Sequence, residues 1–462
     1  MPVKKGQRIE LEISDIAFGG KGLARVDGLA VFVDQAVPLD IVIARITKKR
    51  KQYAEARIDI LVEPSPFRIT PPCIYSGFCG GCKWQFLNYE KQLIYKQQHV
   101  VESLEHIGRI QSVPVHAAIH SKLIFGYRNK MEFSCSDQRW LLPQEMDRDD
   151  IDRNFALGLH VPGTFYKVLD TKTCLLQPES GNHILEQIRT FIKNSEAPVY
   201  GLRSHHGFWR FVMLRHSVAY DQWMVNIITA AEDRDIVQPL ADQLMDNNPK
   251  IVSVINNITS RKAGVALGEY EIPLAGTNSI RDKIGPFEFE ISANSFFQTN
   301  TLGAERLYET VRDYAGLTGK ETLLDLYSGA GTIAISLAAS AKEVIGLEIV
   351  DSAVTDAENN CRLNRISNCR FILGDLRKSL LQITGRPDVM IIDPPRAGMH
   401  NDVVKIVLQM APKRIVYVSC NPATMARDIA MIKDSYSVLE VQPFDMFPHT
   451  HHIESVARLE KM

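Results

Sequence analysis

The chain has 462 residues, of which 45% are hydrophobic and 23% charged, and its formal net charge is −1. This composition is typical of a globular protein with two or three domains, and it excludes a protein that binds nucleic acid through an evenly basic surface. No apolar run approaches the roughly 20 residues needed to cross a bilayer, and the N-terminus lacks the apolar core of a signal peptide, so we expect a cytoplasmic protein. In such a protein the eight cysteines favour metal or catalytic roles over structural disulfides.

Residues 1–62 are predicted to form a small β-barrel. Five short strands in so little chain favour an OB-like barrel, which closes on itself and leaves no free sheet edge. The runs that carry this prediction are Ile9–Ile13, Leu29–Val33, Ile41–Ile46 and Ala54–Leu61, with Gly19–Gly22 as a turn. A linker follows, marked by Pro64, Pro66, Pro71 and Pro72.

The barrel segment is locally basic. Residues 1–57 contain eleven Lys and Arg against seven Asp and Glu, and the basic residues concentrate in Arg45–Lys51. Such a run either contacts nucleic acid or forms a solvated face, and the charge pattern leaves both interpretations open.

Three cysteines, Cys73, Cys79 and Cys82, lie within ten residues just after the linker. Zinc sites usually add a second close pair of cysteines or histidines, and this sequence has no matching pair. Three close thiols with one distant thiol instead suit an iron–sulfur cluster, which needs four thiolates. Cys174 is the candidate for the fourth ligand, and Cys135 is its rival.

Residues 113–290 have the pattern of an α+β region. Two stretches, Tyr127–Ser134 and Phe208–His216, interleave aromatic and basic residues. This mixture suits stacking on unpaired bases with phosphate contacts nearby, and it equally suits a half-exposed strand.

From about residue 320 the pattern alternates strand and helix, which predicts a doubly wound α/β sheet. Gly329 and Gly331 form a turn between strand and helix, without the third glycine of a pyrophosphate-binding turn. Glu348 ends the next strand, where it can bond both hydroxyls of a ribose. Together with the Asp393-Pro-Pro turn after a later strand, this favours S-adenosylmethionine over NAD as the cofactor.

Cys420 lies just past the predicted buried strand Ile415–Val418, and Asn421 and Pro422 suit the cap and first turn of a helix. Ligands of open α/β sheets bind outside the carboxyl ends of the strands, so this thiol is a candidate nucleophile. The alternative is an inert buried cysteine. The helix N-terminus is expected to favour the thiolate.

Taken together, these motifs resemble the RNA (uracil-5-)-methyltransferase family, and within it the iron–sulfur branch that modifies 23S ribosomal RNA. The resemblance runs nearly end to end and rests on Phe297–Asn300, Asp325–Thr332, Asp393–Arg396, Ser419–Pro422 and Phe447–Ser455. It implies a TRAM barrel over 1–62, a central iron–sulfur and RNA-binding domain over 73–91 and 124–290, and a Rossmann-like S-adenosylmethionine-dependent catalytic domain over 92–123 and 291–462. The implied ligands of a [4Fe-4S] cluster are Cys73, Cys79, Cys82 and Cys174.

The resemblance also implies a reaction, methyl transfer from S-adenosylmethionine to carbon 5 of a uridine in 23S rRNA. Cys420 would add to carbon 6 of the uracil, which makes carbon 5 nucleophilic, and Glu454 would then remove the proton on carbon 5. The implied cofactor contacts are Gln298, Tyr327, Glu348, Asp375 and Asp393, with Asp375 placed for the adenine amine. The uridine would have to be single-stranded or flipped out.

Other functions compete with this one. A transfer RNA is an alternative substrate, a radical or redox enzyme would use the cluster and S-adenosylmethionine together, and a non-enzymatic RNA-binding factor would keep the fold alone. Because the proposed reaction is ionic, the cluster is expected to be structural. The three histidines His449, His451 and His452 suggest either a metal site or packing beside a catalytic loop.

Overall fold

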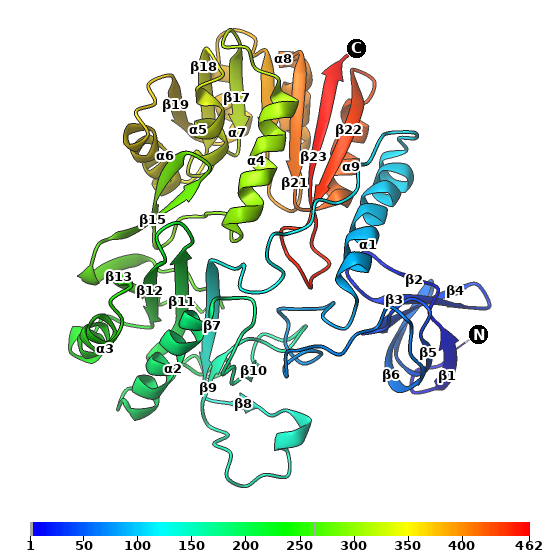
Figure 1. The fold of residues 1–462 in the computed structure, drawn as a ribbon, viewed down its shortest axis with the longest axis vertical. Helices are drawn as coiled ribbons and strands as arrows, with labels where there is room; N and C mark the ends of the chain where they lie inside the picture. The colour runs from blue at the N-terminus through cyan, green and yellow to red at the C-terminus, as the bar shows by residue number, and fades with distance from the viewer. Residues whose placement is uncertain (1–2, 263) are drawn as a thin grey trace.

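The computed structural model describes residues 3–262 and 264–462, which form a small barrel, a central α+β region and a larger α/β sheet (Figure 1). The barrel is blue in Figure 1, the central region is mainly cyan and green, and the α/β sheet runs from yellow-green to red. No helix within these residues is long and apolar enough to cross a membrane.

The N-terminal strands form a six-stranded sheet in the order β1-β5-β6-β4-β3-β2. β1 and β2 are consecutive in the chain, yet β1 pairs with β5 and β2 with β3. Between them, the amide of Ser14 donates to the carbonyl of Leu23 at 2.9 Å, so this bent strand closes the sheet into the predicted barrel. The strands are β1 (Arg8–Glu12), β2 (Asp15–Ile16), β3 (Gly22–Val26), β4 (Leu29–Asp34), β5 (Ile41–Lys49) and β6 (Tyr53–Glu63).

The central region is built on a six-stranded sheet in the order β14-β13-β12-β11-β7-β9, and the two helices α2 and α3 pack on it around a shared apolar core. Two further short strands, β8 and β10, pair in parallel beside it. The elements are β7 (Lys130–Ser136), β8 (Arg139–Trp140), a 3-10 turn (Pro143–Glu145), β9 (Ala156–Gly158), β10 (Val168–Leu169), α2 (Glu179–Asn194), β11 (Trp209–Ser217), β12 (Gln222–Thr229), α3 (Arg234–Asn247), β13 (Ile251–Ile258) and β14 (Tyr270–Gly276).

The two stretches that mix aromatic and basic residues are mostly core. Phe208–His216 coincides with β11, and all of it but His216 is buried. In Tyr127–Ser134 only Glu132 is exposed. The Arg215 guanidinium is fully buried and donates to the Ser295 carbonyl at 2.7 Å. Of the two readings left open by the sequence, packing inside a sheet is therefore the one that fits these strands.

Helix α1 (Tyr89–Glu102) lies far from the last sheet in sequence but beside it in space (Figure 1). Its first turn is capped by Asn88, whose side chain accepts from the amides of Glu90 and Lys91. A π-helical turn (Ser103–Gly108) continues it against helix α9. The chain then forms bridges from Val115 to Val441 and from Ile119 to Phe444, which tie this early segment to the edge of the C-terminal sheet.

The largest sheet has seven strands in the order β19-β18-β17-β20-β21-β23-β22. The first five are parallel, and β23 runs antiparallel to its two neighbours, which confirms the predicted doubly wound α/β arrangement. The elements are β15 (Ser279–Ile284), β16 (Phe287–Ser292), α4 (Thr301–Ala315), β17 (Thr322–Leu326), α5 (Thr332–Ala338), β18 (Glu343–Glu348), α6 (Asp351–Leu363), β19 (Cys369–Leu373), α7 (Leu376–Ser379), a 3-10 turn (Leu380–Gln382), β20 (Val389–Ile392), α8 (Asn401–Met410), β21 (Arg414–Ser419), α9 (Pro422–Ile432), β22 (Tyr436–Phe444) and β23 (Glu454–Lys461).

Each face of this sheet has its own apolar core because side chains alternate along a strand. Val416 and Val418 of β21 point to the face covered by α4 and α5. Ile415 and Tyr417 point to the face covered by α1, α8 and α9. Burial on both faces fixes the register of β21, and therefore the point at which the chain leaves the sheet at Cys420.

Candidate active site

Most of the predicted site residues come together at one edge of the seven-stranded sheet. Parallel strands end at the same edge, and the antiparallel β23 begins there, because Ser455 is paired with Ser419 at the end of β21. The residues at or just past the strand ends are Tyr327 (β17), Glu348 (β18), Asp375 (β19), Asp393 (β20) and Cys420 (β21), and Glu454 is the first residue of β23.

The glycine turn after β17 is held by Glu348. Its carboxylate accepts from the amide of Gly329 at 2.9 Å and from the amides of Ile349 and Val350 at 2.7 and 2.9 Å. Gly331 has a φ of +76°, and a Cβ there would come within 2.8 Å of the Phe371 ring. The turn therefore needs glycine for both conformation and space, and Glu348 keeps part of its acceptor capacity for a ligand.

A cavity of about 310 Å³ opens between the ends of β17, β18 and β19. Tyr327, Glu348 and Asp375 line it, together with His400 and Val403. This volume is in the range of small-molecule pockets. Three of the five predicted cofactor contacts thus share one cavity of suitable size.

The other two predicted cofactor contacts do not line this cavity. Gln298 hydrogen-bonds to the hydroxyl of Tyr308, which also contacts Thr332 of the glycine turn at 2.8 Å. Asp393 lies beyond β20, where burial raises its pKa to about 6. Asp375, although inside the cavity, forms an ion pair with Arg377, which lowers the pKa of the carboxyl to about 2.

The carboxylate of Asp325, to which the sequence analysis gave no role, is buried in β17. Burial raises its pKa well above the usual range, the charge of Asp393 adds to this, and the Ala334 amide opposes it. Neither carboxylate oxygen makes a hydrogen bond of normal geometry to any residue that the structure describes. A buried acceptor without a donor is costly, so this position suits a ligand that brings an N–H group. Its place as the first acid of the glycine motif was the available signal.

Cys420 lies at the start of α9, as the sequence predicts. Asn421 caps this helix by accepting from the amide of Ala423 at 3.1 Å, and Pro422 is its first residue. Burial nevertheless raises the thiol pKa to about 11, and the charges of Glu454 and Asp393 add to this. The expectation that the helix N-terminus would favour the thiolate is therefore wrong for this structure, because burial and two acids outweigh the helix dipole.

Glu454 is only 7% exposed. Burial raises its pKa well above the usual range, the charge of Asp393 raises it further, and Arg396 opposes both. Cys420, Glu454, Asp393 and Arg396 therefore form one electrostatically coupled group. A carboxyl whose pKa approaches neutrality can accept and release a proton under ordinary conditions, as a general base must.

The loop before Glu454 is anchored from a distant part of the chain. Lys96 of α1 is fully buried, and its ammonium donates to Asp445 at 2.5 Å and to the carbonyl of Phe447 at 3.1 Å. Gln92 accepts from the amide of His449, and that histidine's carbonyl accepts from the amides of Lys83 and Trp84. A buried lysine resembles a surface helix residue in sequence, so these contacts carried no sequence signal.

The three histidines of this loop pack among rings rather than around a common point. His449 stacks on Phe125 with centroids 4.3 Å apart, and His451 and His452 lie 4.3 Å apart. Burial lowers the pKa of His449 and His452 to about 4 and that of His451 to about 3, so all three are neutral at pH 7. Within the described chain no group of three His, Cys, Asp or Glu side chains is arranged to hold a single metal ion.

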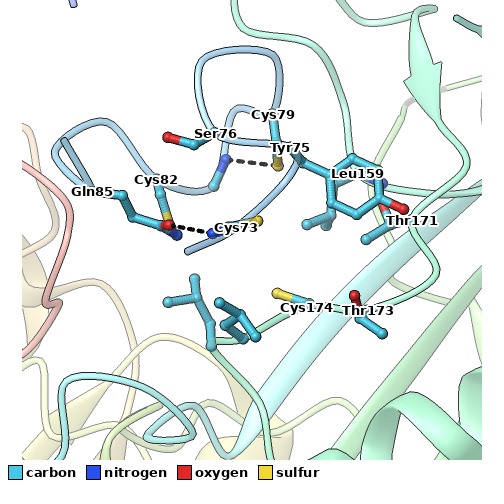
Figure 2. A pocket seen from close by; sticks show the side chains of 13 residues that line it. Cys73, Tyr75, Ser76, Cys79, Cys82, Gln85, Leu159, Thr171, Thr173 and Cys174 are labelled. Carbon is cyan, nitrogen blue, oxygen red and sulfur yellow. Dashed lines mark hydrogen bonds between the residues drawn. The ribbon is translucent and has the colours of Figure 1, made fainter. Parts of the chain in front are cut away.

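Cys73, Cys79, Cys82 and Cys174 line one cavity (Figure 2). The first three belong to one loop, and Cys174 approaches from a separate segment after β10. The Gly81 amide donates to the Cys79 sulfur at 3.3 Å. Burial raises the pKa of Cys79 and Cys82 to about 12, and their charges would repel one another. Four buried thiols with no cation among the lining residues fit a group that brings its own positive charge.

The rival fourth cysteine is elsewhere. Cys135 is fully buried in β7, within the core that α2 and α3 cover, and it does not line the cavity. Tyr75, between Cys73 and Cys79, joins the two cysteine segments: its hydroxyl donates to the Asp170 carbonyl at 3.2 Å and accepts from the Lys172 amide at 2.9 Å. A [4Fe-4S] cluster spreads its four thiolates more widely than a single ion does, so the donor set suits a cluster better than one metal.

Comparison with known proteins places this geometry in a family. The sequence profile of the tRNA (uracil-5-)-methyltransferase family matches residues 219–377 and 385–462, and that of the TRAM domain matches residues 2–58. Over 469 residues the chain is 43% identical to an uncharacterized RNA methyltransferase of Chlorobaculum tepidum, covering 99% of this chain and 97% of the relative. An uncharacterized RNA methyltransferase of Bacteroides thetaiotaomicron is 40% identical, with 96% of this chain and all of the relative covered.

A solved structure resembles the whole chain as well. It is the tRNA (uracil-54, C5)-methyltransferase of Pyrococcus abyssi in complex with S-adenosyl-L-homocysteine, with 28% identity and a TM-score of 0.75 over 98% of this chain and all of the other. The profile match, the full-length relatives and the sheet-edge cavity agree. The chain belongs to the tRNA (uracil-5-)-methyltransferase family of S-adenosylmethionine-dependent RNA methyltransferases, and it carries an N-terminal TRAM domain.

Proposed function

We propose that this protein methylates carbon 5 of a uridine in 23S ribosomal RNA through a covalent bond between Cys420 and carbon 6 of the base. The observation that carries the proposal is the meeting of Cys420, Glu454 and Asp393 at the sheet edge that also bears the cavity of Tyr327 and Glu348. A thiol beside two carboxyls of raised pKa supplies both a nucleophile and a base.

The proposed reaction follows from these groups. Cys420 loses its proton to the neighbouring carboxylates as its sulfur bonds to carbon 6, and the electrons of the 5,6 double bond move to carbon 5 and the ring carbonyl. Bound S-adenosylmethionine supplies an electrophilic methyl group on a sulfonium. Once carbon 5 carries the methyl group, Glu454 takes its proton, the double bond re-forms, and the bond from carbon 6 to the Cys420 sulfur breaks.

The chain's own residues define where the cofactor would lie. Glu348 retains acceptor capacity for ribose hydroxyls, and Tyr327 and Asp375 line the same cavity. Asp325 offers two buried oxygens without a normal hydrogen bond among the described residues, which suits an ammonium donor. Asp393 lies between this acid and Glu454 in its electrostatic effects, so it would connect the cofactor end of the site to the base.

Ribosomal RNA is proposed because the TRAM domain and the four-cysteine cavity occur together, as in the branch that the sequence resembles. Transfer RNA is the second candidate, because the structurally similar Pyrococcus abyssi protein acts on it. Mapping 5-methyluridine in both RNAs from a strain that lacks the gene separates them. We expect one or two uridines of 23S RNA to lose their methyl group while uridine methylation in transfer RNA persists. Loss confined to transfer RNA would refute the ribosomal assignment.

We further propose that Cys73, Cys79, Cys82 and Cys174 hold a structural [4Fe-4S] cluster. Replacing Cys174 with alanine is expected to lower the iron and acid-labile sulfide content severely and to reduce thermal stability, because cluster binding is coupled to folding. Cys135→Ala is the matched control: it also removes a buried thiol of the central region, but one outside the cavity. Equal iron content in the two variants would contradict the ligand assignment, and a requirement for reductant during methyl transfer would contradict the structural role.

A further inference from the structure

One exposed surface of the central region combines aromatic rings and cations without having been apparent in the sequence. It lies around β8 and β10, at the end of the molecule opposite to the seven-stranded sheet (Figure 1). We define the β8–β10 patch as Trp140, Arg153, Tyr166, Lys167 and Arg203. These residues line a depression of about 490 Å³ together with Gln138 and Arg139.

The cations of this patch face rings rather than acids. The Lys167 ammonium lies 3.7 Å from the centre of the Trp140 ring, and the Arg203 guanidinium lies 3.6 Å from that of Tyr166. Within the described chain, Arg153, Lys167 and Arg203 form no ion pair with a carboxylate, and the depression has no acid in its lining. Its charge is therefore free for an anionic ligand.

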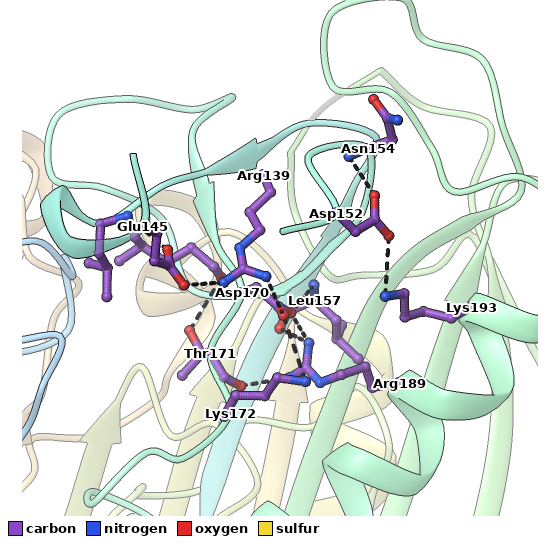
Figure 3. Close-up of polar contacts among 12 residues, drawn as sticks. Arg139, Glu145, Asp152, Asn154, Leu157, Asp170, Thr171, Lys172, Arg189 and Lys193 are labelled. Atoms are coloured by element: carbon purple, nitrogen blue, oxygen red, sulfur yellow. Dashed lines mark hydrogen bonds and ion pairs between the residues drawn. The ribbon is translucent and has the colours of Figure 1, made fainter. Parts of the chain in front are cut away.

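The patch is built on a rigid base (Figure 3). β10 pairs with β8 in register, Val168 opposite Arg139 and Leu169 opposite Trp140. Beneath them, Asp170 is bonded to the buried Arg189 and to Arg139, and Arg139 also pairs with Glu145. Arg139 is thus neutralised and points inward, while its neighbour Trp140 is 38% exposed.

The acidic loop 145–152 beside the patch is largely neutralised as well. Glu145 pairs with Arg139, Asp150 with Arg148, and Asp152 with Lys193. The ring of Phe165, 67% exposed, stands edge-on to Tyr166 on another part of the surface. A second depression of about 90 Å³ extends the first and is also lined by Tyr166 and Arg203.

We propose that the β8–β10 patch binds unpaired nucleotides of the substrate RNA, at a site separate from the one that receives the target uridine. An unpaired base stacks on a guanidinium plane or an aromatic ring, and Arg203, already flat on Tyr166, offers such a plane. Lys167 and Arg153 are placed for the adjoining phosphates. The inference rests on the chain being an RNA methyltransferase, and it does not depend on which RNA is modified.

The test uses the full-length protein and a fluorescent ten-residue adenosine RNA, which contains no uracil for the catalytic site. Lys167→Glu combined with Arg203→Glu should weaken its affinity by on the order of tenfold or more, and should lower the log–log salt slope by about 1.4, or roughly 0.7 for each lost phosphate contact. Trp140→Ala should weaken binding, and Trp140→Phe should restore most of it. Lys320→Glu, on an exposed lysine at the amino end of β17, is the matched control and should have little effect.

Methylation separates this proposal from the proposed chemistry. With the natural RNA, the double charge reversal should raise KM and leave kcat unchanged, whereas Cys420→Ala should remove methylation and keep the affinity for adenosine RNA. Unchanged affinity in the charge-reversal variant, with its thermal unfolding as in wild type, would overturn the proposal. Displacement of the RNA by poly-glutamate at equal charge concentration would also overturn it, because the patch would then bind any acidic polymer, including a protein surface.

Discussion

Replacing Cys420 with alanine is expected to abolish methylation, with a rate loss on the order of 10⁴-fold or more, because no other group can bond to carbon 6 of the uracil. RNA containing 5-fluorouracil provides a direct measurement. Wild-type protein should become covalently attached to it, since carbon 5 then carries fluorine in place of the proton whose removal releases the enzyme. The Cys420→Ala variant should form no such adduct on a denaturing gel.

Cys361→Ala is the control for this experiment. Cys361 is a buried cysteine of α6 in the same sheet domain, away from the strand ends, so its loss should leave adduct formation intact. Because the pKa of the Cys420 thiol is raised to about 11, wild-type adduct formation should accelerate as the pH rises from about 6 to 9, where more thiolate is present. Normal methylation by Cys420→Ala would refute the covalent mechanism.

Replacing Glu454 with glutamine should have a different result. The amide cannot accept the carbon 5 proton, so the methylated adduct with ordinary RNA should form and persist, while turnover falls by about 10²–10⁴-fold. Wild-type turnover should rise with pH above the range of about 4.3 in which an ordinary glutamate titrates, since burial raises the pKa of Glu454 and only its ionised form is a base. The variant should lose this dependence.

Glu460→Gln is the matched control for Glu454, since Glu460 lies in the same strand but pairs with Arg414 and Arg458 at the surface. It should retain normal turnover and release. If Glu454→Gln releases its product as fast as wild type, another group removes the proton, and Asp393, with its pKa raised to about 6, is then the next residue to test.

The elements of the catalytic sheet could be predicted because each is a local pattern. Ile415–Val418 is apolar and β-branched along its whole length, which suits a strand buried on both faces, and Asn421 with Pro422 marks the start of the next helix. Parallel strands end at one edge, so this pattern also predicts that Cys420 and Asp393 lie near each other. The acid that ends β18 was equally visible.

Long-range burial was not predictable in the same way. The alternation of aromatic and basic residues in Phe208–His216 is compatible with an exposed strand, and only the packing of neighbouring strands places Arg215 inside the core. The proton affinity of Cys420 was also misjudged. Sequence placed it at a helix N-terminus, but the desolvation and the two carboxyls that raise its pKa come from the folding of separate strands.

By itself the sequence determined the class of fold, the barrel, the order of strands and helices in the catalytic sheet, and the residue types of the candidate site, because all of these depend on neighbours within a few positions. The tertiary structure alone decided that Cys174 rather than Cys135 lines the cavity with the three loop cysteines, that Lys96 of α1 anchors the loop before Glu454, and that the β8–β10 patch exists. These depend on contacts between residues tens to hundreds of positions apart, whose approach is set by the packing of whole elements and leaves no local pattern.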